Sequence, residues 1–154
     1  MRGMQGGFGR GEGVRDWLAN ADGRVVCLGM DRGEDYIEGI LEALRRHGVR
    51  SGVMLSTVAT FERVRLHQSQ GLEDVNDQRV RTIQGPVEVT GVSGIIADGE
   101  PHLHATVADR DGHAYGGHLE PGCPVLYLAE VAVLALDAPG MTRRPGPDGR
   151  GLRG

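Results

Sequence analysis

Apolar residues follow strand-like patterns through most of the chain. Between Phe61 and His67 apolar and polar residues alternate, and short continuous apolar runs lie before and after this segment. Alternation predicts a half-exposed strand, because successive side chains point to opposite faces, and short branched runs predict buried strands. The predicted strands are Arg24–Met30, Val49–Val58, Phe61–His67, Val80–Ile83, Val87–Ile96 and Val125–Leu136.

One segment has the spacing of a helix instead. Its apolar residues recur at steps of three and four, which places them on one helix face. Acidic residues lie before this segment and basic residues at its end, where both favour the helix dipole, and Gly48 supplies a left-handed stop. We therefore expect an α+β fold, a mostly antiparallel sheet sandwich with one main helix packed on it. The apolar face consists of Tyr36, Ile37, Ile40, Leu41 and Leu44.

A β-hairpin is predicted after Pro101. The only residue at its turn that readily adopts positive φ is Gly112, which predicts a three-residue loop ending in a left-handed glycine. This register pairs Asp109 with His113 and sets His118 directly across from His104. A two-residue loop would shift the register by one and move His118 to the opposite face.

In the three-residue-loop register, His102, His104 and His118 share one face of the hairpin, because residues two apart on a strand point the same way. Three neutral imidazoles with an open fourth position are typical of a catalytic or ligand-accepting zinc site. The spacing therefore predicts a site for zinc or another divalent metal. The alternative is that the three are ordinary polar residues on a half-solvated face. His113 falls on the other face.

Composition narrows the classes of function. The chain has 154 residues, which suits one compact domain, and its net charge of -4 argues against broad binding of a phosphate backbone. Two cysteines, Cys27 and Cys123, are too few for a disulfide scaffold, and no apolar run is long enough to span a bilayer. We expect a protein of the reducing cytoplasm.

The two ends of the chain contain few residues that could form a core. Residues 1–21 are predicted to form a flexible arm, with Val14–Ala21 as a candidate for a short helix, and residues 22–138 to form the domain. Residues 139–154 are predicted to be a disordered basic tail, which carries Arg143, Arg144, Arg150 and Arg153.

Several segments, in this order, resemble the PPC (plants and prokaryotes conserved) domain family. The resemblance extends from about Arg24 to Leu136, and its most specific parts are the two histidine segments. The matching segments are Arg32-Gly33-Glu34-Asp35, Gly85-Pro86-Val87-Glu88-Val89, Val92-Ser93-Gly94-Ile95-Ile96, Pro101-His102-Leu103-His104, Gly116-Gly117-His118-Leu119 and Ala129-Glu130-Val131.

The resemblance implies a homotrimer with a histidine-lined metal site, which on this chain corresponds to His102, His104 and His118. In plant members the domain follows an AT-hook that binds the minor groove of DNA, and it serves partner contacts in transcriptional control. This sequence has no Arg-Gly-Arg-Pro hook. Its nearest segment, Arg143-Arg144-Pro145, lacks the central glycine.

Two functions remain open. The first is a trimeric regulatory protein that contacts DNA or a transcription partner, with weak direct DNA affinity. The second is a small zinc-dependent enzyme or ligand-binding protein, in which Glu100 or Glu120 could act as a base and a neighbouring subunit's Arg63 or Arg65 could complete a pocket. An open metal coordination shell beside a pocket would favour the second.

Overall fold

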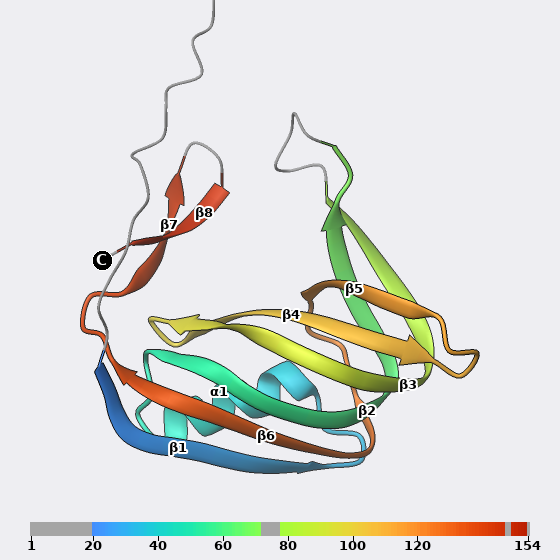
Figure 1. Cartoon of the computed structure of the whole chain (residues 1–154), viewed down its shortest axis with the longest axis horizontal. Helices are drawn as coiled ribbons and strands as arrows, with labels where there is room; N and C mark the ends of the chain where they lie inside the picture. The colour runs from blue at the N-terminus through green and yellow to red at the C-terminus, as the bar shows by residue number, and fades with distance from the viewer. Residues whose placement is uncertain (1–19, 72–77, 147–148, 154) are drawn as a thin grey trace, which may run out of the picture.

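The structure is a computed structural model, which describes residues 20–71, 78–146 and 149–153 (Figure 1). Its elements, in chain order, are β1 (Asn20–Asp31), α1 (Tyr36–Arg46), β2 (Gly52–Ser69), β3 (Gln78–Ala97), β4 (Glu100–Asp109), β5 (Ala114–Leu119), β6 (Val125–Asp137), β7 (Thr142–Gly146) and β8 (Gly149–Arg153). Within these ranges, no helix has the length and apolar character that a membrane crossing requires.

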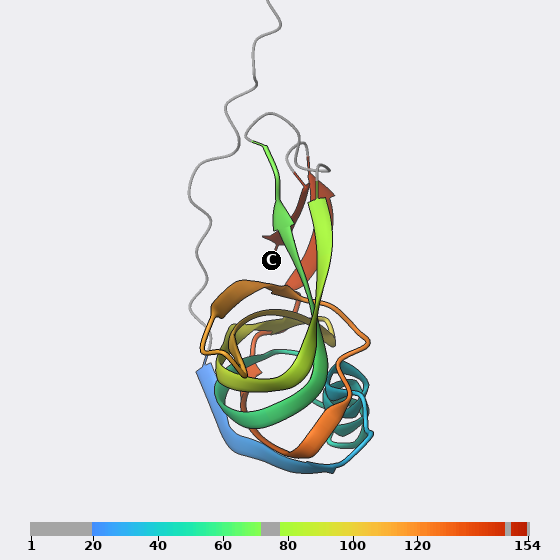
Figure 2. The ribbon, with the colours of Figure 1, turned by 90° about the vertical axis from the view of Figure 1, so that its right-hand side faces the viewer.

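Six strands form one antiparallel sheet in the order β1-β6-β2-β3-β4-β5, and β7 pairs with β8 separately. The large sheet curls strongly, so that β5 also pairs with β2 (Figure 2). This second pairing closes β2, β3, β4 and β5 into a ring. It brings the end of β5 next to a part of the chain that is distant in sequence.

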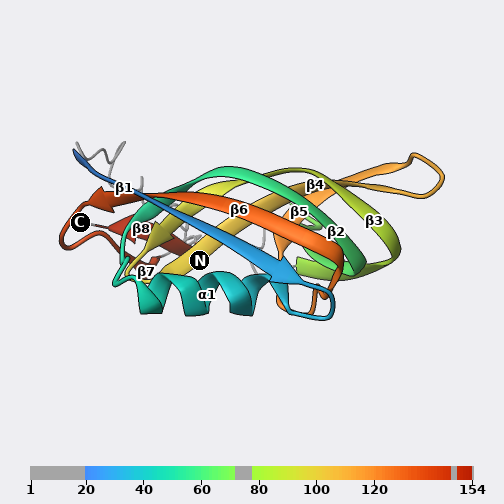
Figure 3. The same ribbon diagram turned by 90° about the horizontal axis from the view of Figure 1, so that it is seen from below.

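Helix α1 lies along one side of the curled sheet (Figure 3). Tyr36, Ile40 and Leu44 lie fully buried against the core, at the spacing predicted for the apolar face. Asp35 caps the helix by accepting hydrogen bonds from the backbone N–H groups of Ile37 and Glu38. The helix ends before Gly48, whose φ of 66° is left-handed as predicted.

The core lies between α1 and the inner face of the sheet. The Tyr36 ring meets the Phe61 ring edge-on at 5.2 Å, and its hydroxyl is 2.6 Å from the Thr57 hydroxyl. Burial raises the pKa of Tyr36 to about 12, so the phenol stays neutral. The predicted α+β class, a mostly antiparallel sheet with one helix packed on it, is confirmed.

Two pairs of predicted strands prove to be continuous. Strand β2 joins Val49–Val58 to Phe61–His67, and β3 runs through the cis Gly85-Pro86 peptide bond. Bulges at Met54/Ser56, Ala59/Phe61 and Phe61/Arg63 bend β2, which is why the apolar pattern breaks without ending the strand. The apolar residues of the second half, Phe61, Val64 and Leu66, are buried in the chain's own core.

The C-terminal region differs from the disordered tail expected from its composition. Residues 142–146 and 149–153 pair as a short hairpin, and the Arg143 guanidinium donates to the Ile95 carbonyl at 2.8 Å. Met141 is buried, and Ser51 Oγ donates to the Ala138 carbonyl. Long-range contacts of this kind leave no periodic pattern in the sequence. Most of the predicted N-terminal arm, residues 1–19, lies outside the described residues.

Candidate metal site

The β4–β5 hairpin has the register predicted from its turn. Gly112 has a φ of 81°, Asp109 N–H donates to the His113 carbonyl at 3.0 Å, and His104 lies directly across from His118. The Asp109 side chain closes the turn by accepting from the backbone N–H groups of Asp111 and His113, each at 2.9 Å. The three-residue loop is therefore confirmed.

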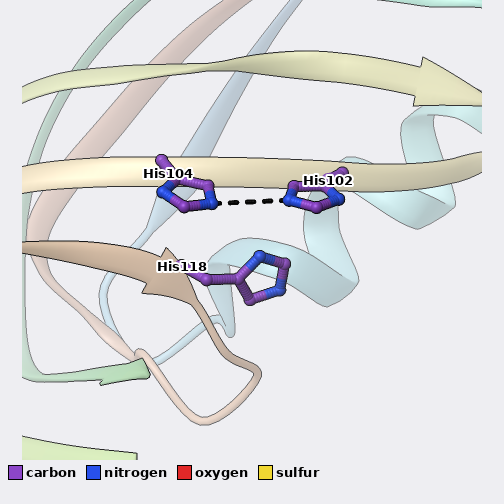
Figure 4. A group of neighbouring side chains, drawn as sticks. All are labelled: His102, His104 and His118. Atoms are coloured by element: carbon purple, nitrogen blue, oxygen red, sulfur yellow. Dashed lines mark hydrogen bonds between the residues drawn. The ribbon is translucent and has the colours of Figure 1, made fainter. Parts of the chain in front are cut away.

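The side chains of β4 alternate between the core and the opposite face of the sheet, and its two histidines lie on the opposite face. Leu103, Ala105 and Val107 are buried, while the alternating residues His102 and His104 point to the other face. The two imidazoles lie nearly parallel, with an interplanar angle of 8° and their Nε2 atoms 3.4 Å apart (Figure 4). One partly buried ring and one exposed ring thus present nitrogens to the same space.

His118 approaches this pair from β5. Its ring stands at 84° to His102 and 88° to His104, and Figure 4 shows one of its nitrogens directed at the pair. One ligand atom from each histidine lies within 4.8 Å of the others. The structure therefore brings together the three histidines that the sequence analysis selected.

A fourth histidine, His67, was missed by the sequence analysis. It lies on β2 directly across from His118, and the two rings stack at 4.3 Å with an interplanar angle of 24°. Its Nδ1 atom also pairs with the carboxylate of Glu120. His67 has no local motif, and only the long-range pairing of β2 with β5 places it here.

Gly117 allows this pairing. A Cβ atom at Gly117 would lie 2.8 Å from the His67 carbonyl oxygen and 3.3 Å from Leu66 Cβ, too close for any other residue without a shift of the strands. The glycine before His118 was therefore the one available signal that another backbone approaches β5 closely.

Two rings of the cluster, those of His118 and His102, favour their neutral form. Burial, followed by the neighbouring His67 and His102, lowers the pKa of His118 to about 4. Burial also lowers the pKa of His102, with a further contribution from the positive charge of Arg143. A neutral imidazole keeps a free lone pair at neutral pH, and that lone pair is what a metal ion binds.

The other candidate residues have different surroundings. Glu100 is exposed at the start of β4, whereas Glu120 is inside the cluster through its bond to His67. Arg65 donates to the Pro121 carbonyl of its own chain at 2.6 Å. Both cysteines are free, and burial raises the pKa of Cys123 to about 11, so its thiol is not poised to act as a thiolate ligand or nucleophile.

Comparison with known families identifies the domain. The model of the Plants and Prokaryotes Conserved (PCC) domain matches residues 18–137. The chain belongs to this family. The match confirms the resemblance drawn from the histidine segments, and it covers every strand from β1 to β6 together with α1.

Solved structures of the same fold come from several organisms. A metal-containing protein of Archaeoglobus fulgidus is 21% identical, with a TM-score of 0.78 over 91% of this chain and 98% of that one. A PPC protein of Pyrococcus horikoshii is 22% identical, with a TM-score of 0.77 over 90% and 96%. A Bacteroides thetaiotaomicron protein, provisionally named as DNA-binding, is 16% identical, with a TM-score of 0.74 over 88% and 96%.

A curated relative has the domain within a longer protein. The bifunctional protein GlmU of a Synechococcus strain is 28% identical over 124 residues, which are 80% of this chain and 19% of that protein. The chain thus spans about a fifth of the length of the curated relatives it matches.

Proposed function

We propose that His102, His104 and His118 hold one divalent metal ion, zinc by preference. The observation that carries the proposal is the 3.4 Å between the Nε2 atoms of His102 and His104. Two nitrogens bound tetrahedrally to zinc at ~2.0–2.1 Å are about 3.3 Å apart, so these rings need almost no movement to share an ion. The Archaeoglobus protein, which has the same fold, is named as metal-containing.

The proposed site is open. Three protein nitrogens leave the fourth tetrahedral position to an outside ligand, and His104 is exposed, so a small molecule can reach it. A bound zinc ion would act there as a Lewis acid toward that ligand. The chain's own residues hold the three rings at fixed angles, with β4 and β5 as a rigid support.

A ligand-binding or enzymatic role is the second candidate function, and Arg143 favours it. Arg143 donates to the carbonyl of Ile95, the residue opposite His102 in the β3–β4 ladder. Its charge also lowers the pKa of His102, which indicates that the guanidinium lies close to the site. A positive charge beside an open metal position would favour an anionic ligand such as a carboxylate.

The experiment for the metal site uses His104→Gln, because His104 belongs only to the three-histidine set. Chelator-treated protein is titrated with Co²⁺, whose absorption spectrum reports the ligands. We expect the variant to lose the Co²⁺ band of this site and at least 100-fold in affinity, while His113→Gln, on the same hairpin, keeps both. Unchanged affinity in His104→Gln would refute the site.

We also propose that the chain assembles as a homotrimer. The support is the family together with several large apolar side chains that are exposed on β2 and β6: Leu55 (52%), Val58 (55%), Tyr127 (68%) and Leu128 (46%). A neighbouring subunit would cover such residues, and its Arg63 could then reach the metal site. Light scattering should give the mass of three chains, and Val58→Asp should lower it.

We propose a regulatory role that depends on contacts with partner proteins in the cytoplasm. We expect direct DNA binding to be weak and to depend on the C-terminal region. The net charge of -4 opposes broad phosphate binding. The support for a DNA role is the Bacteroides protein of the same fold. Four arginines in the C-terminal region limit the slope of log K against log salt to about −3.6. A sequence-specific complex with DNA that survives deletion of residues 141–154 would contradict the expectation of weak DNA binding.

A further inference from the structure

A second group of ligand atoms lies beside the three-histidine set. One atom each from His67, His118 and Glu120 lies within 4.8 Å of the others. His67 comes from β2, and the other two from the end of β5 and the residue that follows it. The contacts of His67 and Glu120 with each other do not involve His102 or His104, so this group stands on its own geometry.

The strand ladder holds the three side chains on one face. His67 lies directly across from His118, and Glu120 points the same way as His118 because it is two residues further on. The Glu120 N–H donates to the Arg65 carbonyl at 3.0 Å, which keeps the segment after β5 aligned with β2. The His67 and Glu120 side chains are 19% and 27% exposed, so they are sheltered yet within reach of solvent.

The chemistry of the group suits a metal ion. In the structure, the Glu120 carboxylate meets His67 at Nδ1, so an oxygen and a nitrogen ligand atom already face each other. Two imidazoles and one carboxylate are a set that first-row divalent ions accept.

We propose that His67, His118 and Glu120 form a second site for a divalent transition-metal ion, which shares the His118 ring with the three-histidine site. The ring has two nitrogens, and Figure 4 shows that one is directed at the His102–His104 pair and the other away from it. When both sites are filled, each nitrogen serves one ion, and the N–H proton of His118 leaves to solvent. His118 is therefore the residue on which both ions depend.

Zinc stoichiometry in single variants tests this arrangement. Chelator-treated full-length protein is dialysed against Zn²⁺, and the ions bound per chain are counted by elemental analysis. We expect two ions for the wild type and for His47→Gln, an exposed histidine outside both groups. We expect one ion for His67→Gln, for Glu120→Gln and for His102→Gln, and none for His118→Gln.

The pattern separates the two sites. The second site is overturned if the folded variants His67→Gln and Glu120→Gln both bind as many ions as the wild type. If the wild type binds one ion, which His102→Gln keeps and Glu120→Gln loses, the three-histidine proposal fails and the second site stands. Circular dichroism confirms the fold of each variant, and the two variants lie on different strands, so each checks the other.

Discussion

His118 has a histidine neighbour on each side, and the two sides are built differently. On one side, His104 belongs to the same hairpin and is positioned by a tight turn closed by Asp109. On the other side, His67 comes from β2, far away in the sequence, and its position depends on the curl of the whole sheet. The geometry of a turn can be predicted from a few neighbouring residues. The pairing of β2 with β5 depends instead on every strand that lies between them in the sheet.

The largest loss of unfolding free energy is expected at Asp35, which holds the chain segment just after Glu120. Asp35 caps α1 and also accepts from the backbone N–H groups of Gly122 and Cys123, at 2.8 and 2.9 Å, just after Glu120. Asp35→Ala loses a cap of ~1 kcal/mol and two charge-assisted bonds of ~1.5 kcal/mol or more each, so we expect a loss of about 3–5 kcal/mol in urea unfolding. Asp35→Asn keeps a cap acceptor and should lose less. Equal losses in the two variants would contradict a separate contribution from the helix cap.

A smaller loss is expected where β5 meets β2. In Gly117→Ala the new methyl group would press on the His67 carbonyl and Leu66, which should cost ~1–3 kcal/mol of unfolding free energy. Zinc bound through His67 should fall, while that bound through His102 and His104 stays. Gly116→Ala is the control, because its Cβ would lie 3.6 Å from the nearest atom, an ordinary contact. If the two variants unfold alike in thermal scans, the close approach is not limiting.

Substitutions in the β4–β5 turn are expected to lower the free energy of unfolding by a smaller amount. Gly112 has a φ of 81°, and an alanine there would cost ~1–2 kcal/mol in the left-handed region, partly offset by a more restricted unfolded chain. We expect a net loss of about 0.5–1 kcal/mol in Gly112→Ala. Gly112→Asn should stay close to the wild type, since asparagine tolerates this conformation. A stabilised Gly112→Ala would show that the turn is not left-handed in solution.

The smallest effect concerns acid. Burial opposes ionisation of Asp109, but hydrogen bonds from the His113 backbone and the Tyr115 hydroxyl win and lower its pKa to about 2. A carboxylate with a lowered pKa contributes stability above its unfolded pKa of ~3.9, and the contribution is lost as the pH falls toward 2. In Tyr115→Phe the pKa of Asp109 should rise, so acid unfolding begins at a higher pH. A chemical-shift titration of Asp109 measures this directly, and an unchanged pKa would exclude the tyrosine as a cause.

The sequence predicted what local rules control. The face of α1 followed from the spacing of Tyr36, Ile40 and Leu44, and the pairing of His104 with His118 followed from the positive φ that Gly112 alone could adopt at the turn. His67 could not be found in this way. It is the last residue of the predicted strand Phe61–His67, and its pairing with His118 is fixed by the closure of β2 on β5, which no local rule predicts.

From the ring closure we expect an order of events during folding. The β4–β5 hairpin joins neighbouring residues at a small cost in loop-closure entropy, whereas the β2–β5 contact joins residues far apart in the sequence, so we expect it to form later. His102, His104 and His118 therefore meet while the ring is still open. A cation bound at that stage would hold β5 in the register that β2 needs. The metal-bound hairpin would then favour the β2–β5 pairing that completes the ring.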